Sequence, residues 1–270
     1  MRILVTGAHG QLGRRVIARA TALGHELVMS KIDICKSITL PPCDLVINAA
    51  AYTAVDKAEL ESERAFAVNR DGAANLARVC RDHGVTLIHV STDYVFDGTA
   101  SSPYREDDSV TPLSVYGASK AEGERAVLDL GGTVVRTSWL FGEGGPSFVH
   151  SILRLARERL VLRVVADQHG CPTYAGDLAE ALLALAPAPH GIYHYCGDEV
   201  ATWHAVAVAV IKAAHLSVVI EPISTADYPT AARRPLYSVL DTLRVRTLGI
   251  APSAWRSRII QVVTHELRER

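Results

Sequence analysis

The fold of this chain is decided near its start, where Ile3–Gly13 reads ILVTGAHGQLG. The short apolar run predicts a buried strand, and the glycines that follow it have the spacing G-x-x-G-x-x-G. Gly7 allows a tight turn, Gly10 lets a ligand approach the backbone, and Gly13 lets the next helix pack against the strand. The N-terminus of that helix presents unpaired N–H groups and the positive end of its dipole, so the sequence predicts a pyrophosphate site.

The alternation of strand and helix continues through the first two thirds of the chain. Short apolar runs predict further strands at 26–29, 45–50, 86–90 and 133–140. Amphipathic stretches between them predict helices at 11–23, 62–83 and 114–130. This pattern predicts a doubly wound parallel α/β sheet, a Rossmann fold, whose ligands bind beyond the carboxyl ends of the strands.

Beyond Gly142 the pattern loosens, and shorter elements predict a smaller lobe. We expect helices at 147–158, 177–185, 202–214 and 253–268, a strand at 160–166 and a loop at 226–237. Residues 1–142, with parts of the later chain, are therefore expected to form the dinucleotide-binding domain. Residues 143–270 are expected to form mainly a smaller α/β substrate-binding lobe.

The composition excludes several classes of protein. With 270 residues and 49% apolar side chains the chain can bury a large core, which excludes disorder. Its 28 basic and 29 acidic residues give a net charge of −1, so no basic surface is expected to hold a nucleic acid. No apolar run reaches the ~18–20 residues of a membrane span, and the start lacks a secretory-signal pattern. Five cysteines without a C-x-x-C pair indicate the reducing cytoplasm.

The end of the second predicted strand bears on the choice of cofactor. It reads Met29-Ser30-Lys31, without the acid that would hold the ribose 2′-hydroxyl of NAD. Lys31 suits the extra phosphate of NADP, which favours NADPH with NADH as the alternative; a solvated charge is the other interpretation of Lys31. The cofactor contacts that we expect in this segment are Ser30, Lys31, Asp33 and Ile34.

A second motif predicts the chemistry. Tyr116 and Lys120 are four residues apart in the predicted helix 114–130, so they share one face of it. An ammonium beside a phenol favours the phenolate, and we expect Lys120 to lower the pKa of Tyr116 from about 10. Thr92, at the end of the preceding strand, can hydrogen-bond the same substrate oxygen. Together with the glycine turn and the strand end Asn48-Ala49-Ala50, these residues predict a site that adds hydride to a carbonyl carbon and a proton to its oxygen.

The sequence resembles the dTDP-4-dehydrorhamnose reductase family of extended short-chain dehydrogenases/reductases. The resemblance rests on blocks spread from end to end: VTGAHGQLG at 5–13, VINAAAYTAVDKAE at 46–59, VSTDYVFDG at 90–98, VYGASKAEGE at 115–124, RTSWLFG at 136–142, DQHGCPT at 167–173 and YPTAARRPLYSVLDT at 228–242. It implies NAD(P)H-dependent reduction of dTDP-4-dehydro-L-rhamnose to dTDP-L-rhamnose, a step of dTDP-rhamnose biosynthesis. The stretch 31–44 is shorter than is usual in this family.

The resemblance also implies roles for single residues. Tyr116 would donate the proton to the C4 oxygen, Lys120 would bind the nicotinamide ribose, and Thr92 would bind the substrate oxygen. The cofactor would lie along Gly7, His9, Gly10, Gln11, Leu12, Gly13, Ala49, Ala50, Ala51, Thr53 and Val90. The sugar would contact Asp93, Tyr94, Val95 and Trp139, with Arg234 as a diphosphate clamp.

Three other functions are considered, of which two stay open and one is disfavoured by the residues present. Relatives in this group reduce other dTDP-4-keto-6-deoxyhexoses, and others are non-catalytic NADP-binding regulatory subunits. A sugar-nucleotide dehydratase is disfavoured, because Thr92-Asp93 is followed by Tyr94 instead of a second acid. A homodimer is left open.

Other chemically suggestive residues are interpreted as structural. His194 and His204 are expected to be hydrogen-bonded groups, and no metal site is assigned. Trp203 and Trp255 lie in helical patterns and are expected in the core.

Overall fold

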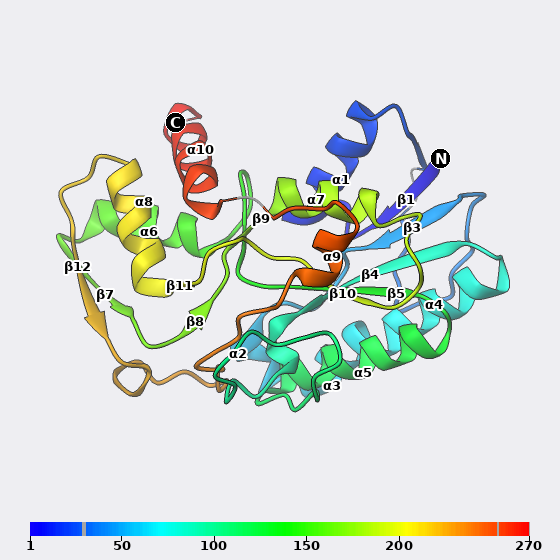
Figure 1. The fold of residues 1–270 in the computed structure, drawn as a ribbon, viewed down its shortest axis with the longest axis horizontal. Helices are drawn as coiled ribbons and strands as arrows, with labels where there is room; N and C mark the ends of the chain where they lie inside the picture. Colours follow the sequence, from blue (N-terminus) through cyan, green and yellow to red (C-terminus); the bar gives the residue numbers. More distant parts are fainter. Residues whose placement is uncertain (29–30, 253, 270) are drawn as a thin grey trace.

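A six-stranded parallel sheet forms the core of one half of the protein, on the right in Figure 1. The computed structural model describes residues 1–28, 31–252 and 254–269. The strands are β1 (Arg2–Thr6), β2 (Glu26–Val28), β3 (Leu45–Asn48), β4 (Thr86–Thr92), β5 (Thr133–Thr137) and β10 (Ile192–His194). Within the described residues they lie in the order β10-β5-β4-β3-β1-β2, and all of these pairs are parallel. The predicted doubly wound fold is confirmed.

The two faces of the sheet bury alternate side chains of the same strands. Ile3 and Ile47 pack toward α1 (Gln11–Ala22) and α7 (Ala175–Ala184). Leu4 and Val46 pack toward α4 (Ala73–Asp82) and α5 (Val115–Asp129). Because successive side chains of a strand point to opposite faces, strands covered on both sides are apolar throughout, as their sequences predict.

The helix predicted over 62–83 is divided by a π-helical segment. It consists of α3 (Ser62–Phe66), the π-helix η1 (Ala67–Gly72) and α4. The wider turn places the buried side chain of Asn69 so that it bonds the Tyr52 backbone in both directions, at 2.8 and 3.0 Å, and Ser119 Oγ at 3.0 Å. The π-helix therefore fastens the segment after β3 to α5.

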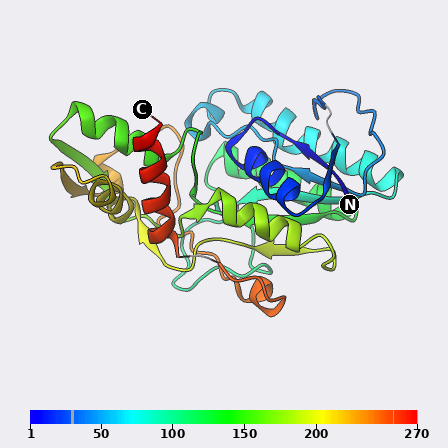
Figure 2. The same cartoon turned by 90° about the horizontal axis from the view of Figure 1, so that it is seen from above.

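The second lobe has its own apolar core and lies beside the sheet domain, as Figure 2 shows from above. Its main elements are α6 (Phe148–Glu158), β7 (Val161–Val165), α8 (Trp203–Ala213), β12 (Val219–Ile223) and α10 (Trp255–Arg268). The predicted helices and the strand at 160–166 are confirmed, with Thr202 capping α8 by accepting the Ala205 N–H at 3.1 Å. The pattern missed β12, which pairs with β7, and β10, which returns to the main sheet beside β5.

The remaining elements are short. They are α2 (Val55–Ala58), η2 (Asp93–Val95), β6 (Leu140–Phe141), β8 (His169–Gly170), β9 (Thr173–Tyr174), β11 (Ala201–Thr202), η3 (Thr225–Asp227) and α9 (Leu243–Thr247). The strand predicted at 133–140 is interrupted after Thr137, because Trp139 adopts a left-handed backbone conformation with φ 48°. Among the described residues, no helix combines the length and apolar character of a membrane span.

A buried ion pair joins α5 to β5. The guanidinium of Arg136 donates to both carboxylate oxygens of Glu124, at 2.8–3.1 Å, and the two side chains are 2% and 3% exposed. His194 accepts from Arg136 at 3.3 Å through Nε2 and bonds the Tyr104 carbonyl through Nδ1 at 3.1 Å. Each charge is compensated, which is the condition under which burial of an ion pair is tolerated.

Breaking this pair should be costly. Glu124→Gln leaves the Arg136 guanidinium buried without a counter-charge, and we expect a loss of about 3–5 kcal/mol in the free energy of unfolding, measured by urea denaturation. Glu158→Gln is the control, because its partner Arg154 and Glu158 itself are 62% and 54% exposed; it should change stability by less than about 0.5 kcal/mol. Equal losses of stability in Glu124→Gln and Glu158→Gln would contradict a special contribution of the buried ion pair.

Candidate active site

A cavity of about 1350 Å³ lies at the carboxyl ends of the central strands, between the sheet and the second lobe. The order of the strands reverses between β1 and β3, and ligands of such sheets bind at this kind of switch point. Predicted site residues line it from both sides: His9, Gly10, Gln11, Leu12, Ala49, Ala51, Thr53, Val90, Thr92, Tyr94, Tyr116, Lys120, Trp139 and Arg234.

Other predicted residues lie outside the lining of this cavity. They are Gly7, Gly13, Lys31, Asp33, Ile34, Ala50, Asp93 and Val95, and Ser30 falls outside the described residues. Ile34 is 3% exposed and packs in the apolar layer under α4. Lys31 is exposed, and Asp33 pairs with Lys36 at 3.5 Å. Cofactor contacts in this segment stay predictions.

The glycine turn has the geometry that an anion requires. A Cβ on Gly7 would lie 2.6 Å from the Ala50 nitrogen, and one on Gly13 would lie 2.2 Å from the Gly7 carbonyl oxygen, so neither position has room for a side chain. Gly10 caps α1 without a side-chain hydrogen bond, and the first turn of the helix carries no acid. The end of α1 therefore presents its N–H groups and its positive dipole end without a competing carboxylate.

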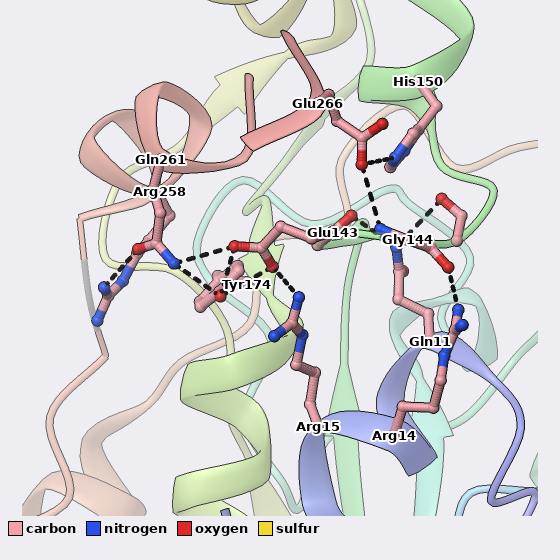
Figure 3. Close-up of polar contacts among 12 residues, drawn as sticks. Gln11, Arg14, Arg15, Glu143, Gly144, His150, Tyr174, Arg258, Gln261 and Glu266 are labelled. Carbon is pink, nitrogen blue, oxygen red and sulfur yellow. Dashed lines mark hydrogen bonds and ion pairs between the residues drawn. The ribbon is translucent and has the colours of Figure 1, made fainter. Parts of the chain in front are cut away.

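The loop 142–147 crosses the start of α1 and is tied there by polar contacts, drawn in Figure 3. Gln11 donates to the Gly142 carbonyl at 3.1 Å, and Arg14 donates to the Gly144 carbonyl. The carboxylate of Glu143 accepts from Arg15, from Tyr174 Oη and from Gln261 of α10. This cluster, which the sequence pattern did not reveal, joins the second lobe to the helix that begins the predicted cofactor site.

Thr92, Asp93 and Tyr116 form a connected group at the end of β4. Thr92 Oγ1 donates to Asp93 Oδ1 at 3.0 Å and accepts the Tyr94 N–H at 3.2 Å, and Tyr116 bonds the same hydroxyl. The second oxygen of Asp93 accepts from Ser238 at 2.6 Å. Ser238 lies in the block 228–242, so this segment of the second lobe reaches the predicted catalytic residues.

The electrostatics of Tyr116 differ from the prediction. Burial raises the pKa of Tyr116 to about 12. The hydrogen bond with Thr92 lowers this pKa, and the negative charge of Asp93 raises it further. The expectation that Lys120 lowers this pKa is wrong, because Lys120 Nζ bonds the Val90 carbonyl at 2.6 Å and His89 Nε2 at 3.1 Å. Burial lowers the pKa of Lys120 itself to about 8, against the attraction of Glu124.

Two tryptophans form the wall of the cavity on the lobe side. Trp139 and Trp203 stack with their ring centroids 3.6 Å apart, and Gly170 leaves room for the Trp139 ring, which would lie 2.5 Å from a Cβ at that position. Trp203 is partly buried against the core of the second lobe and also lines the cavity, so its assignment to the core is confirmed only in part, whereas Trp255 is fully buried as expected. Trp203 is the first residue of α8, where its ring reaches the cavity. Helical periodicity does not predict the direction of a side chain at the end of a helix.

The remaining predicted residues find protein partners. Arg234 forms a two-pronged ion pair with Asp56 of α2, at 2.7 and 3.0 Å, so a diphosphate at Arg234 would have to share its guanidinium with this carboxylate. His194 holds Arg136 as described, and His204 Nε2 bonds the Ile220 carbonyl at 3.1 Å, which supports their structural interpretation.

Comparison with known proteins identifies the family. The family described as the RmlD substrate binding domain matches residues 1–268. The chain belongs to this family. A dTDP-4-dehydrorhamnose reductase of Aggregatibacter actinomycetemcomitans is 44% identical, over 94% of this chain and 96% of that protein. A dTDP-4-keto-6-deoxy-D-glucose reductase of Streptomyces niveus is 36% identical, over 96% of each. The crystal structure of the Bacillus anthracis dTDP-4-dehydrorhamnose reductase in complex with NADP matches with a TM-score of 0.91 and 33% identity, over 98% of this chain and 99% of that one.

The buried carboxyl group of Asp93 should shape the pH dependence of stability. Burial raises its pKa to about 7, against hydrogen bonds from Ser238 and Thr92. Between about pH 4 and pH 7 the folded protein therefore keeps a proton that the unfolded chain has lost, so stability falls as pH rises through this window. We expect Asp93→Asn to flatten the fall, measured by urea unfolding at pH 5 and pH 7.5.

Asp97 provides a control of opposite sign. Its pKa is lowered, first by the Thr99 N–H and then by the Tyr104 hydroxyl, so its stabilisation is lost as pH falls. Asp97→Asn should reduce the loss of stability at acid pH and leave the Asp93 window unchanged. A wild-type slope between pH 5 and pH 7.5 that survives in Asp93→Asn would overturn the assignment.

Proposed function

We propose that this chain reduces the C4 carbonyl of dTDP-4-dehydro-L-rhamnose to give dTDP-L-rhamnose, with NADPH as reductant. The observation that carries the proposal is the convergence of Thr92, Tyr116 and Lys120 in one cavity with the glycine turn. Membership of the family and near full-length similarity to dTDP-4-dehydrorhamnose reductases support the same activity.

The residues at the carboxyl edge of the sheet fit a dinucleotide. The start of α1 suits the pyrophosphate, and Ala49, Ala51 and Val90 offer small or apolar surface along the strand ends. When bound there, NADPH supplies the hydride. We assign the extra phosphate to Lys31 and a ribose hydroxyl of the cofactor to Lys120, which lines the cavity.

The chain's own residues manage the proton. Tyr116 donates its phenolic proton to the C4 oxygen, and its raised pKa keeps that proton in place until charge develops on the oxygen. The Thr92 hydroxyl, which is hydrogen-bonded to Asp93 and to Tyr116, orients the phenolic oxygen of Tyr116 at the end of β4. A cavity with two walls could hold the cofactor and the sugar in contact geometry, which would contribute much of the rate enhancement.

The two parts of the chain divide the work in this proposal. Residues 1–142, with later segments such as α7 and β10, bind the cofactor, and residues 143–270 mainly bind the nucleotide sugar. The described cysteines are all unpaired, which favours the reducing cytoplasm as the compartment.

A second candidate is reduction of another dTDP-4-keto-6-deoxyhexose. The Streptomyces niveus relative favours it, because its similarity extends over the same length. A turnover screen over dTDP-4-keto sugars with NADPH and NADH, with the C4 stereochemistry of each product determined, distinguishes the two. Absence of turnover with every sugar would favour a regulatory, non-catalytic relative.

Tyr116→Phe should abolish most activity while preserving cofactor binding. The variant lacks the donated proton but keeps the ring and its edge contact with Tyr94, whose centroid is 6.0 Å away. We expect kcat to fall by roughly 10²–10⁴-fold and the NADPH dissociation constant to stay within about twofold. Steady-state kinetics and fluorescence titration measure the two quantities. Wild-type turnover by Tyr116→Phe would contradict the role of Tyr116 as proton donor.

Lys31→Ala should weaken NADPH more than NADH. Removing a charged hydrogen bond to the 2′-phosphate is expected to cost about tenfold in NADPH affinity, with little effect on NADH. Lys212→Ala, an exposed lysine on α8 in the other lobe, is the matched control and should change neither. Equal losses for the two cofactors in Lys31→Ala would remove Lys31 from cofactor selection.

A further inference from the structure

A column of buried polar side chains runs from β1 to Lys120 beneath the cavity. Thr6 Oγ1 donates to Asn48 Oδ1 at 2.6 Å, Asn48 Nδ2 lies 2.8 Å from His89 Nδ1, and His89 Nε2 lies 3.1 Å from Lys120 Nζ. The four residues are between 0% and 3% exposed, so their hydrogen bonds are made mainly within the protein. Each proton in the column must therefore be accounted for by the neighbouring groups.

The backbone fixes the direction of these bonds. The Ala50 N–H donates to an atom of the Asn48 amide at 3.1 Å, and a donor requires an acceptor, so that atom is the oxygen. The amide nitrogen is then the group that faces His89, and it donates to Nδ1. An imidazole that accepts at Nδ1 carries its proton at Nε2. His89 is therefore a donor toward Lys120.

An ammonium cannot accept that hydrogen bond, because Lys–NH₃⁺ has three donors and no acceptor. A neutral amine can: it donates to the Val90 carbonyl at 2.6 Å and accepts from His89 Nε2 with its lone pair. We propose that His89 is a positioning residue that favours the uncharged amine of Lys120 and holds this form against β4. Protonation of Nζ by solvent removes the lone pair, breaks the bond to His89 and frees the ammonium for the cavity that Lys120 lines.

The charges around Lys120 leave this assignment intact. Glu124, one turn further along α5, favours the ammonium, but Arg136 of β5 already binds both of its oxygens. Burial lowers the pKa of His89 well below its usual value, which favours the neutral ring, and any charge on Lys120 acts in the same direction. Other ionisable groups on elements packed against α5 have partners of their own. Arg70 of η1 pairs with Asp71 and Glu122. Glu59 accepts the Val115 N–H, and Asp93 of η2 is hydrogen-bonded to Ser238 and Thr92.

The tautomer of His89 is the direct test, made on the wild-type protein without added ligands. Long-range ¹H–¹⁵N correlation spectra of ¹⁵N-labelled protein distinguish a protonated Nε2 from a protonated Nδ1. We expect the proton on Nε2, unchanged from pH 6 to pH 9. A proton on Nδ1, or a doubly protonated ring, overturns the proposal.

The protonation of Lys120 is the second test. The chain has five lysines, so ¹³Cε signals can be followed individually during a pH titration, with Lys120 assigned from its absence in Lys120→Met. We expect a wild-type midpoint near 8, as burial lowers the pKa of Lys120 to about this value. In His89→Leu the opposing donor is gone, and the midpoint should rise by at least about 1 unit, a tenfold gain in proton affinity.

Thr6→Val is the matched control. It removes a hydrogen bond from the same column, but Asn48 stays oriented by the Ala50 N–H, so stability should fall while the Lys120 midpoint stays within about 0.3 units. Equal midpoints in wild type and His89→Leu, or equal shifts in both variants, would refute a specific role for His89. If His89→Leu does not fold, the tautomer of His89 in the wild-type protein still tests the proposal.

The inference rests on the proposed function only for its catalytic consequence. If the ammonium of Lys120 is the active form, kcat/KM falls as pH rises through the Lys120 pKa, and His89→Leu moves this alkaline limb upward. If His89→Leu shifts the Lys120 midpoint measured by NMR but leaves the alkaline limb of kcat/KM unchanged, His89 is still the positioning residue. The proposed catalytic use of the Lys120 ammonium is then contradicted. The two failures are therefore distinguishable.

Discussion

The in-register pairing of β1, β3 and β4 is the constraint on which the rest of the site depends. Thr6 lies opposite Asn48, and Asn48 lies opposite His89, so one polar side chain from each strand falls on a single line across the sheet. A slip of one residue would bury these groups without partners and turn them to the other face, at a cost of several kcal/mol. The same register brings the glycine turn, the 49–51 strand end and Thr92 to one edge.

The second lobe completes the cavity through a small number of polar junctions. Glu143 is the most connected of them, because its carboxylate receives groups from α1, from Tyr174 and from α10. Ser238 forms a second junction, at the carboxyl group that holds Thr92. These contacts tie the orientation of the lobe to the two places where the chain is proposed to hold phosphates and to donate a proton.

Local patterns predicted the sheet domain well, for reasons that particular residues illustrate. Gly7 and Gly13 are required by steric contacts inside one turn, and Tyr116 and Lys120 share a face by helical geometry alone. The π-helical turn at Asn69, the cavity-facing ring of Trp203 and the pairing of Arg234 with Asp56 were not predicted. Each depends on a partner that is distant in the chain or on the direction of one side chain, and periodicity contains neither.

The sequence by itself determined the fold class, the glycine turn and the family, and it placed Tyr116 and Lys120 of the proposed catalytic trio on one helix face. These features follow from spacing within single elements and from blocks of residues that stand in order along the chain. Tertiary structure alone decided the charge state that each group prefers. It paired Lys120 with His89 and the Val90 carbonyl, and it raised the pKa of Tyr116 instead of lowering it. The physical reason is that burial and the direction of a hydrogen bond are properties of neighbours in space, and the chain reveals those neighbours only when its strands have paired.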